Sequence, residues 1–245
     1  MDLLKKFGVK INNEMEGGLE FVETQDWNLC EVINFHIKGG QSFKATDIDL
    51  ESDWSSAANF MVAGALFGKV ALTGLDTTSL QADLSIVDIL MEAGVSMSQE
   101  EDTGILRVQR APLQALDIDA SNCPDLFPII SLMAAFCNGT SHIGGVSRLI
   151  GKESNRAEVI LEMLKQMGVS AHIAKDKMVI KGQSLCQRLL SGNLLKAGKY
   201  SSHHDHRMVM ALKIAQFGAD GPIEIDDEAC IEKSFPSFFE LYKKL

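Results

Sequence analysis

Apolar residues and glycines recur along this chain in a constant order. Residues 5–11, 91–97 and 166–171 each contain a helix end, a glycine and then an alternating stretch. Leucines or isoleucines at helical spacing precede each of these segments. Glycine adopts the left-handed conformation that closes a helix, and alternation is typical of a strand. We therefore predict a helix and then a strand at each place. Residues 105–108 predict a further strand after the segment at 91–97, and residues 178–180 predict one after the segment at 166–171.

A second kind of predicted helix precedes these segments. Its members are rich in alanine, methionine and phenylalanine, and they cover residues 56–67, 124–137 and 205–217. Short apolar strands follow them at 70–72, 141–143 and 222–225. The unit is therefore helix, strand, helix, strand, strand, repeated about every 70 residues. Helices that alternate with strands predict a layered α/β (α+β) fold in which helices cover sheets, and a short last helix is predicted at 236–244.

The first 50 residues have a different pattern. They contain two turn clusters, Gly17-Gly18 and Gly39-Gly40, around possible short strands. The turn residues Ser52 and Asp53 precede the first alanine-rich helix. We therefore place a domain boundary near 49–52, with one part at 1–49 and the other at 50–245.

Composition excludes several classes of protein. Apolar residues make up 46% of the chain and charged residues 23%, which is ordinary for a globular protein rather than a disordered one. The net charge of −10 argues against a general nucleic-acid surface, which needs a basic face. The richest apolar run, residues 60–67, is too short to span a bilayer, so no membrane partner is expected.

The five cysteines are scattered and none pairs at the spacing of a metal or redox motif. They stand at positions 30, 123, 137, 186 and 230. An odd number at irregular spacing predicts neither a disulfide framework nor structural zinc, so a reducing cytoplasm is expected. The first residues contain no apolar segment typical of a signal peptide.

Charged residues gather where helices are predicted to begin. The set comprises Asp125, Lys152, Glu153, Arg156, His206, Arg207 and Lys233. Basic residues at a helix N-terminus oppose the helix dipole, and Lys152 and Arg156, four apart, would repel each other on one face. A bound anion would compensate both effects. The alternative is that nearby acids neutralise these cations in ordinary ion pairs.

Two other chemistries receive less support. His203 and His206 could share a helix face, but no further histidine or cysteine cluster completes a zinc ligand set, so no metal is expected. Ser55 and Ser56 lack the glycine-flanked elbow of a serine nucleophile and are better interpreted as helix caps.

Five motifs carry a resemblance to a known family. They are Asp53-Trp54-Ser55-Ser56, Pro124-Asp125, Lys152-Glu153-Ser154-Asn155-Arg156, Asp205-His206-Arg207-Met208 and Lys233-Ser234-Phe235-Pro236. Their order resembles that of the 5-enolpyruvylshikimate-3-phosphate synthase (3-phosphoshikimate 1-carboxyvinyltransferase) family over essentially the whole chain. A sister family that acts on UDP-N-acetylglucosamine shares the fold but has different motifs at these positions.

The resemblance implies an inside-out α/β architecture. Family members consist of two similar domains, each built from repeated βαβαββ units around buried parallel helices, with the active site in the cleft between them. The chain resembles the C-terminal portion of such an enzyme. Residues 1–49 would be the incomplete tail of the N-terminal domain, and residues 50–245 the C-terminal enolpyruvyl transferase domain.

The resemblance also implies a reaction. The enolpyruvyl group of phosphoenolpyruvate passes to the 5-hydroxyl of shikimate 3-phosphate and phosphate is released, in the shikimate pathway of chorismate and aromatic amino-acid biosynthesis. No metal or redox cofactor is needed. The partners would be these two substrates and the missing N-terminal domain.

Roles for individual residues follow from the same resemblance. Asp125 would be the general base near the 5-hydroxyl, and Glu153 and Lys233 would move protons at C3 of phosphoenolpyruvate. The binding residues would be Lys152, Arg156, His206, Arg207 and Lys233. Asn155 departs from the aspartate usual before the arginine, which leaves the orientation of Arg156 open.

Two alternatives remain at this point. The chain alone could be a non-catalytic domain, because half of the cleft would be missing and the closure that assembles the site could not occur. A same-fold transferase acting on UDP-N-acetylglucosamine is the second alternative. We expect the isolated fragment to be inactive.

Overall fold

The computed structural model describes residues 1–24, 29–152 and 154–245, which form two compact units, residues 1–50 and 51–245. The first unit is a hairpin with two short helices. Its elements are α1 (Asp2–Lys6), β1 (Ile11–Gly17), α2 (Leu19–Thr24) and β2 (Cys30–Ile37). β1 and β2 pair antiparallel, with Ile11 opposite Ile37. Most of β2 is exposed, including Phe35 and Ile37.

The second unit begins with a helix, strand, helix, strand, strand segment. Its elements are α3 (Trp54–Phe67), β3 (Lys69–Leu72), α4 (Ile86–Glu92), β4 (Ser96–Gln99) and β5 (Leu106–Gln109). The three strands form an antiparallel sheet in the order β3-β5-β4. Asp53 caps α3, because its carboxylate accepts hydrogen bonds from the backbone N–H groups of Ser55 and Ser56, both at 3.1 Å.

The next segment repeats this order with one more strand in front. It comprises β6 (Asp117–Asp119), α5 (Phe127–Phe136), β7 (Gly139–Gly144), α6 (Arg156–Gln166), β8 (Ser170–Ala174) and β9 (Lys177–Gly182). The sheet order is β6-β7-β9-β8, and β6 and β7 are parallel. Short 3-10 helices, η3 (Pro124–Leu126) and η4 (Val146–Leu149), follow the two parallel strands.

The last segment contains a second pair of parallel strands. Its elements are α7 (Leu185–Ser191), β10 (Gly198–Tyr200), α8 (His206–Ala215), β11 (Ile223–Ile225), the 3-10 helix η6 (Ala229–Lys233) and α9 (Phe238–Tyr242). β10 and β11 form a two-stranded sheet. The remaining 3-10 helices are η2 (Ala82–Ser85) and η5 (Gln216–Gly218).

The glycines expected to close helices do so. Gly8, Gly94 and Gly168 all have positive φ, at 78°, 86° and 79°, in the left-handed region that glycine occupies without steric cost. The strands predicted after the last two are β4 and β8.

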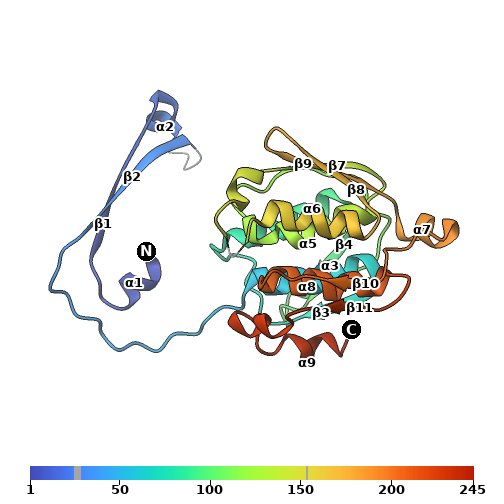
Figure 1. The fold of residues 1–245 in the computed structure, drawn as a ribbon. Helices are drawn as coiled ribbons and strands as arrows, with labels where there is room; N and C mark the ends of the chain where they lie inside the picture. Colours follow the sequence, from blue (N-terminus) through green and yellow to red (C-terminus); the bar gives the residue numbers. More distant parts are fainter. Residues whose placement is uncertain (25–28, 153) are drawn as a thin grey trace. The chain divides into compact units, whose positions relative to one another are not determined.

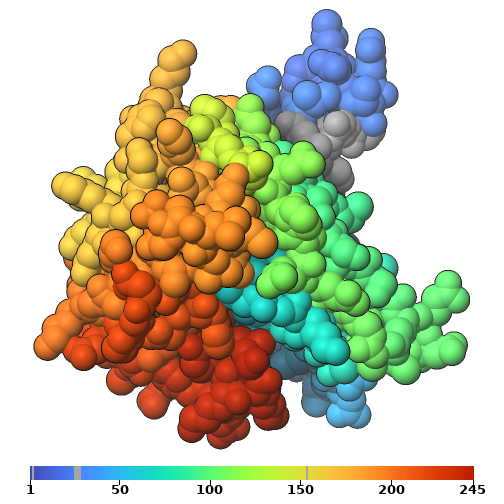
Figure 2. Space-filling view, turned by 90° about the vertical axis from the view of Figure 1, so that its right-hand side faces the viewer, coloured from blue at the N-terminus to red at the C-terminus, as the bar shows by residue number. Residues whose placement is uncertain are grey.

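The layering differs from the general expectation that helices would cover sheets. In Figure 1, α3, α5, α6 and α8 lie between the four-stranded sheet on one side of the second unit and β3, β10 and β11 on the other. All ten residues of α5 are buried, as are eleven of the fourteen in α3. A helix that is apolar all round belongs in a core, and the apolar composition of α3 and α5 is the cause of their burial. In α6 one face is buried, and Glu158, Glu162 and Lys165 are exposed on the other. Figure 2 shows the C-terminal segments, in red, directly beside the cyan residues of the α3–β3 region.

Other differences concern short elements. The strands β6 and β10 are three residues each and were not predicted, and neither was α7. The helix on which Lys152 and Arg156 were expected to share a face begins only at Arg156. Lys152 lies in the preceding loop, so that expectation is wrong. Among the described residues, no helix is long and apolar enough to cross a membrane.

Candidate functional site

The candidate site lies where two pairs of parallel strands end. The carboxyl ends of neighbouring parallel strands meet at one sheet edge, which is where α/β proteins place ligands. The backbone N–H of Ala120, after β6, donates to Gly144 at the end of β7 (3.1 Å). The N–H of Asp226, after β11, donates to Tyr200 at the end of β10 (3.2 Å). The segments that follow these four strands, helices included, contain Asp125, Lys152, Arg156, His206, Arg207 and Lys233.

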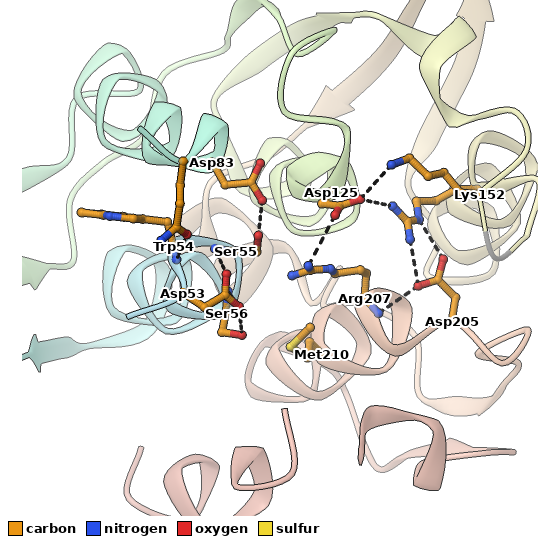
Figure 3. A network of polar contacts seen from close by, with 12 residues as sticks. Asp53, Trp54, Ser55, Ser56, Asp83, Asp125, Lys152, Asp205, Arg207 and Met210 are labelled. Atoms are coloured by element: carbon orange, nitrogen blue, oxygen red, sulfur yellow. Dashed lines mark hydrogen bonds and ion pairs between the residues drawn. The ribbon is translucent and has the colours of Figure 1, made fainter. Parts of the chain in front are cut away.

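Asp125, in η3, is the centre of a charge cluster. Its Oδ1 accepts from Arg156 Nη1 at 2.9 Å and from Lys152 Nζ at 3.3 Å, and its Oδ2 lies 3.4 Å from Arg207 Nη2. The three cations come from the loop after β7, from α6 and from α8 (Figure 3). The sequence-predicted residues Asp125, Lys152, Arg156 and Arg207 are thus brought together.

Asp205 is a site residue whose main contact the sequence analysis missed. Its carboxylate accepts from Arg156 Nε at 2.8 Å and from Nη2 at 3.2 Å, and it also caps α8 by accepting from the Arg207 N–H at 2.9 Å. Both side chains of the Arg156–Asp205 pair are completely buried. Asp205 is recognisable in the sequence as a helix cap, but its pairing with a residue 49 positions away is not.

The guanidinium of Arg207 has donors that the described residues do not use. Its side chain is 11% exposed, and within the described parts of the chain its buried Nε and Nη1 have no hydrogen-bond partner. Buried donors normally find partners, and a guanidinium fork matches a carboxylate or phosphate. The side chain is therefore suited to an anionic ligand.

A second buried carboxylate, Asp83 in η2, faces the same region. It accepts a short hydrogen bond from the Ser55 hydroxyl (Figure 3) and is 8% exposed. Burial raises the pKa of Asp83; the Ser55 hydrogen bond opposes this, and the Asp125 carboxylate adds to it. In the sequence, Ser55 is recognisable only as part of a helix cap, and nothing marks Asp83, because its partner comes from a distant segment.

The pKa of Asp125 lies below its ordinary value. Burial alone would raise it, but the hydrogen bond from Arg156 and the charges of Arg207, Arg156 and Lys152 together outweigh burial. Asp125 is therefore a carboxylate at neutral pH, in the state that a general base requires.

The structure describes two of the three remaining predicted residues, Lys233 and His206. Lys233 is exposed, and its Nζ donates to the carbonyl oxygen of His204, in the loop that precedes α8, at 3.2 Å. His206 is the first residue of α8 and is 8% exposed. Glu153 is outside the described residues.

The neighbouring histidines bind acids rather than one another. His203 Nε2 lies 3.3 Å from Glu162, and His204 Nδ1 lies 2.6 Å from Asp227. In the described part of the chain, no group of three His, Cys, Asp or Glu side chains is arranged to hold a metal ion.

The chain is similar to proteins of one known family. A family model described as EPSP synthase (3-phosphoshikimate 1-carboxyvinyltransferase) matches residues 1–241. The 3-phosphoshikimate 1-carboxyvinyltransferase of Brachyspira hyodysenteriae is 37% identical over 220 residues, which cover 90% of this chain and 49% of that protein. The Clostridium kluyveri enzyme of the same name is 34% identical over 245 residues, which cover 100% of this chain and 51% of its own.

Solved structures show the same relationship in space. An EPSP synthase from Acinetobacter baumannii superposes with a TM-score of 0.74 at 25% identity, covering 99% of this chain and 53% of that one. An enolpyruvyl transferase from Streptomyces tendae has a TM-score of 0.68 at 15% identity and supports the fold alone. The chain spans about half the length of the curated relatives that it matches. With a mixed α/β fold that matches half of these structures and a family match over nearly its full length, the chain belongs to the EPSP synthase family.

Proposed function

We propose that this chain supplies one side of a carboxyvinyl transferase site that binds phosphoenolpyruvate and shikimate 3-phosphate. The observation that carries the proposal is the convergence of Lys152, Arg156 and Arg207 on Asp125. Two buried nitrogens of Arg207, Nε and Nη1, have no partner among the described residues and can donate to a ligand. Both substrates are anions, so clustered cations at the ends of parallel strands suit them.

The reaction assigns a role to each group. The 5-hydroxyl of shikimate 3-phosphate loses its proton to Asp125 and adds to C2 of phosphoenolpyruvate, while C3 gains a proton from Glu153 or Lys233. The tetrahedral intermediate then returns a proton from C3 and expels phosphate from C2, which forms the enolpyruvyl ether. Arg156, Arg207 and His206 would hold the phosphoenolpyruvate anion, and Lys152 would contact the shikimate moiety.

Ligand binding would tune the base. Three cations lower the pKa of Asp125, which makes it a weak base while it is a counterion that they share. Substrate anions that engage the same cations weaken this stabilisation, so the pKa of Asp125 rises toward the range useful for proton transfer. Positioning and charge stabilisation supply the larger part of the rate gain in such a site.

A second candidate is a non-catalytic binding unit, and the length of the chain favours it for the isolated polypeptide. Because the chain covers about half of its relatives, we propose that residues 1–49 are the tail of one domain and residues 50–245 nearly all of another, and that the chain alone is inactive. The exposed Val32, Phe35 and Ile37 on β2 support a missing neighbour for the first unit. An isolated two-stranded hairpin is marginally stable.

The finer architecture is also a proposal. The order βαβαββ from β6 to β9, and its shorter versions before and after, support an inside-out domain of repeated units around buried helices.

All five cysteines are free, which is typical of proteins in a reducing cytoplasm.

The decisive experiment joins this chain to the part of the Brachyspira hyodysenteriae relative that it lacks. We expect phosphate release from shikimate 3-phosphate plus phosphoenolpyruvate, and a loss of at least about 100-fold in kcat for Arg207→Ala, as for other removed anion-stabilising groups. Lys181→Ala, on the exposed face of β9, is the matched control. Near-normal turnover of the Arg207 variant would contradict the proposal, and turnover with UDP-N-acetylglucosamine instead would assign the sister reaction.

The unmodified chain provides the companion measurement. It should release no phosphate from the two substrates, while inorganic phosphate should bind weakly and protect it against thermal unfolding. Measurable turnover by the chain alone would overturn the non-catalytic candidate.

A further inference from the structure

The loop that leads into α8 contains two residues in an unfavourable backbone conformation. His203 and His204 have φ values of 51° and 57°, in the left-handed region that residues other than glycine rarely adopt. Such conformations persist where surrounding contacts fix them, and they concentrate at functional sites. The next residue along the chain is Asp205, which holds Arg156.

Asp226 is the residue that fixes the start of this loop. It follows β11, and its carboxylate accepts from the Ser201 hydroxyl at 2.6 Å, from the Ser202 N–H at 2.8 Å and from the Ser202 hydroxyl at 3.0 Å. It also accepts from the N–H of Asp227 at 2.8 Å. Burial alone would raise the pKa of Asp226, but these hydrogen bonds outweigh it and lower the pKa to about 2. Asp226 is therefore charged at any neutral pH.

Neighbouring contacts tie down the rest of the loop. Asp227 contacts His204 at 2.6 Å, and Lys233 donates to the His204 carbonyl oxygen at 3.2 Å. His203 lies 3.3 Å from Glu162 of α6, the helix that begins with Arg156. The loop thus connects the end of β11, the Lys233 segment and α6 at the point where Asp205 enters the core.

We propose that Asp226 is a positioning residue for the anion site. It holds residues 201–204 in place, so that the Asp205 carboxylate can bind the Arg156 guanidinium and accept the hydrogen bond from the Arg207 backbone N–H. This inference rests on the proposed function for the meaning of the site. Asp226 acts through Asp205 and is not itself expected to touch a substrate.

The chain offers a matched control at the other end of the same strand pair. Asp220 precedes β11 and accepts from the Ala197 N–H at 2.7 Å and from Lys196 at 3.0 Å, before β10. Asp220 and Asp226 therefore tie the same two strands together, Asp220 at the end away from the site. Removal of either affects local structure, but only Asp226 is connected to Asp205.

The experiment compares Asp226→Ala, Ser201→Ala and Asp220→Ala in the full chain. The first readout is the Arg156 Nε–H signal in a ¹H–¹⁵N spectrum, which the buried bond to Asp205 protects from exchange. We expect this signal to be lost or to exchange at least about tenfold faster in Asp226→Ala, to weaken in Ser201→Ala, and to stay unchanged in Asp220→Ala. The second readout is the Kd for inorganic phosphate, expected to rise about tenfold or more in Asp226→Ala, as for a lost contact to a charged group.

The outcomes separate the two proposals. An unchanged Arg156 signal in both Asp226→Ala and Ser201→Ala, or an equal loss in Asp220→Ala, would overturn the positioning role. A wild-type chain that binds no phosphate but loses the Arg156 signal on Asp226→Ala would support the positioning role and count against the proposed function. Ser201 is exposed, so its variant keeps the test usable if Asp226→Ala does not fold.

Discussion

The guanidinium of Arg156 and the carboxylate of Asp205 form an ion pair with no exposed side-chain surface on either partner. Their closest atoms, Nε and Oδ2, are 2.8 Å apart, and the pair joins the first turn of α6 to the cap of α8. A buried pair of this kind gains little net stability, because desolvation offsets attraction, but its loss leaves a charge without a counterion.

Removal of one partner should therefore be costly. Asp205→Ala should lower the free energy of unfolding by about 3–5 kcal/mol, measured by urea denaturation. Asp117→Ala removes the exposed pair with Lys177, whose side chains are 69% and 49% exposed, and should cost less than about 1 kcal/mol. Equal costs for the two variants would show that the buried pair is not special.

The cap of α3 gives a second prediction. Asp53→Ala removes the acceptor for two backbone N–H groups and should destabilise the second unit by about 0.5–2 kcal/mol. Asp53→Asn keeps a side-chain oxygen and should lose much less. Thermal unfolding measures both variants, and an Asp53→Asn variant as unstable as Asp53→Ala would contradict the prediction.

Asp83 and Asp226 should affect the pH dependence of stability in opposite directions. The pKa of Asp83 is raised above 3.8, chiefly by burial, so the folded state holds its proton to higher pH than the unfolded state does. Its contribution to stability therefore grows as the pH falls from neutral toward about 4. The free energy of unfolding, measured against pH, should therefore lack this increase in the Asp83→Asn variant.

The pKa of Asp226 is lowered, because its hydrogen bonds outweigh burial, to about 2 from 3.8. Its stabilising contribution is fully present above pH 3.8 and is lost as the pH falls toward about 2. The difference between wild type and Asp226→Asn should thus shrink in acid. A difference that is constant from pH 7 to pH 2 would contradict the role of its charge.

Gly182 should not tolerate a side chain. A Cβ there would lie 2.2 Å from the carbonyl oxygen of Ala134 and 2.3 Å from that of Cys137, because β9 passes directly over the end of α5. Gly182→Ala should therefore cost about 1–3 kcal/mol, as overpacked sites do. Gly39, with no described heavy atom within 4 Å of its Cβ position, should accept alanine with little change.

The sequence predicted the local parts of this fold better than the site. Helix ends marked by Gly94 and Gly168 were correct because a left-handed cap depends on neighbouring residues alone. The three-residue strands β6 and β10 are too short to show a periodicity, so their pairing was invisible. The helix charges were singled out by their position, but which carboxylate each cation meets depends on tertiary structure.

Asp83 illustrates the same limit. Nothing beside it in the sequence marks it as buried, and its partner Ser55 is 28 residues away. The motif resemblance identified the residues at helix starts and omitted the acids, Asp83 and Asp226, that surround or support them. Such supporting residues are found from contacts, since their own chemistry is ordinary.

The meeting of Asp125 with Arg207 has a consequence for the order of folding. The two residues are 82 positions apart and leave different sheets, so this contact closes a long loop. Long-range contacts of this kind form after local helices and hairpins, because the entropy of loop closure must be overcome first. The charge cluster should therefore be among the last features to mature, and a slow-folding chain would reach nearly native secondary structure before it gains any affinity for anions.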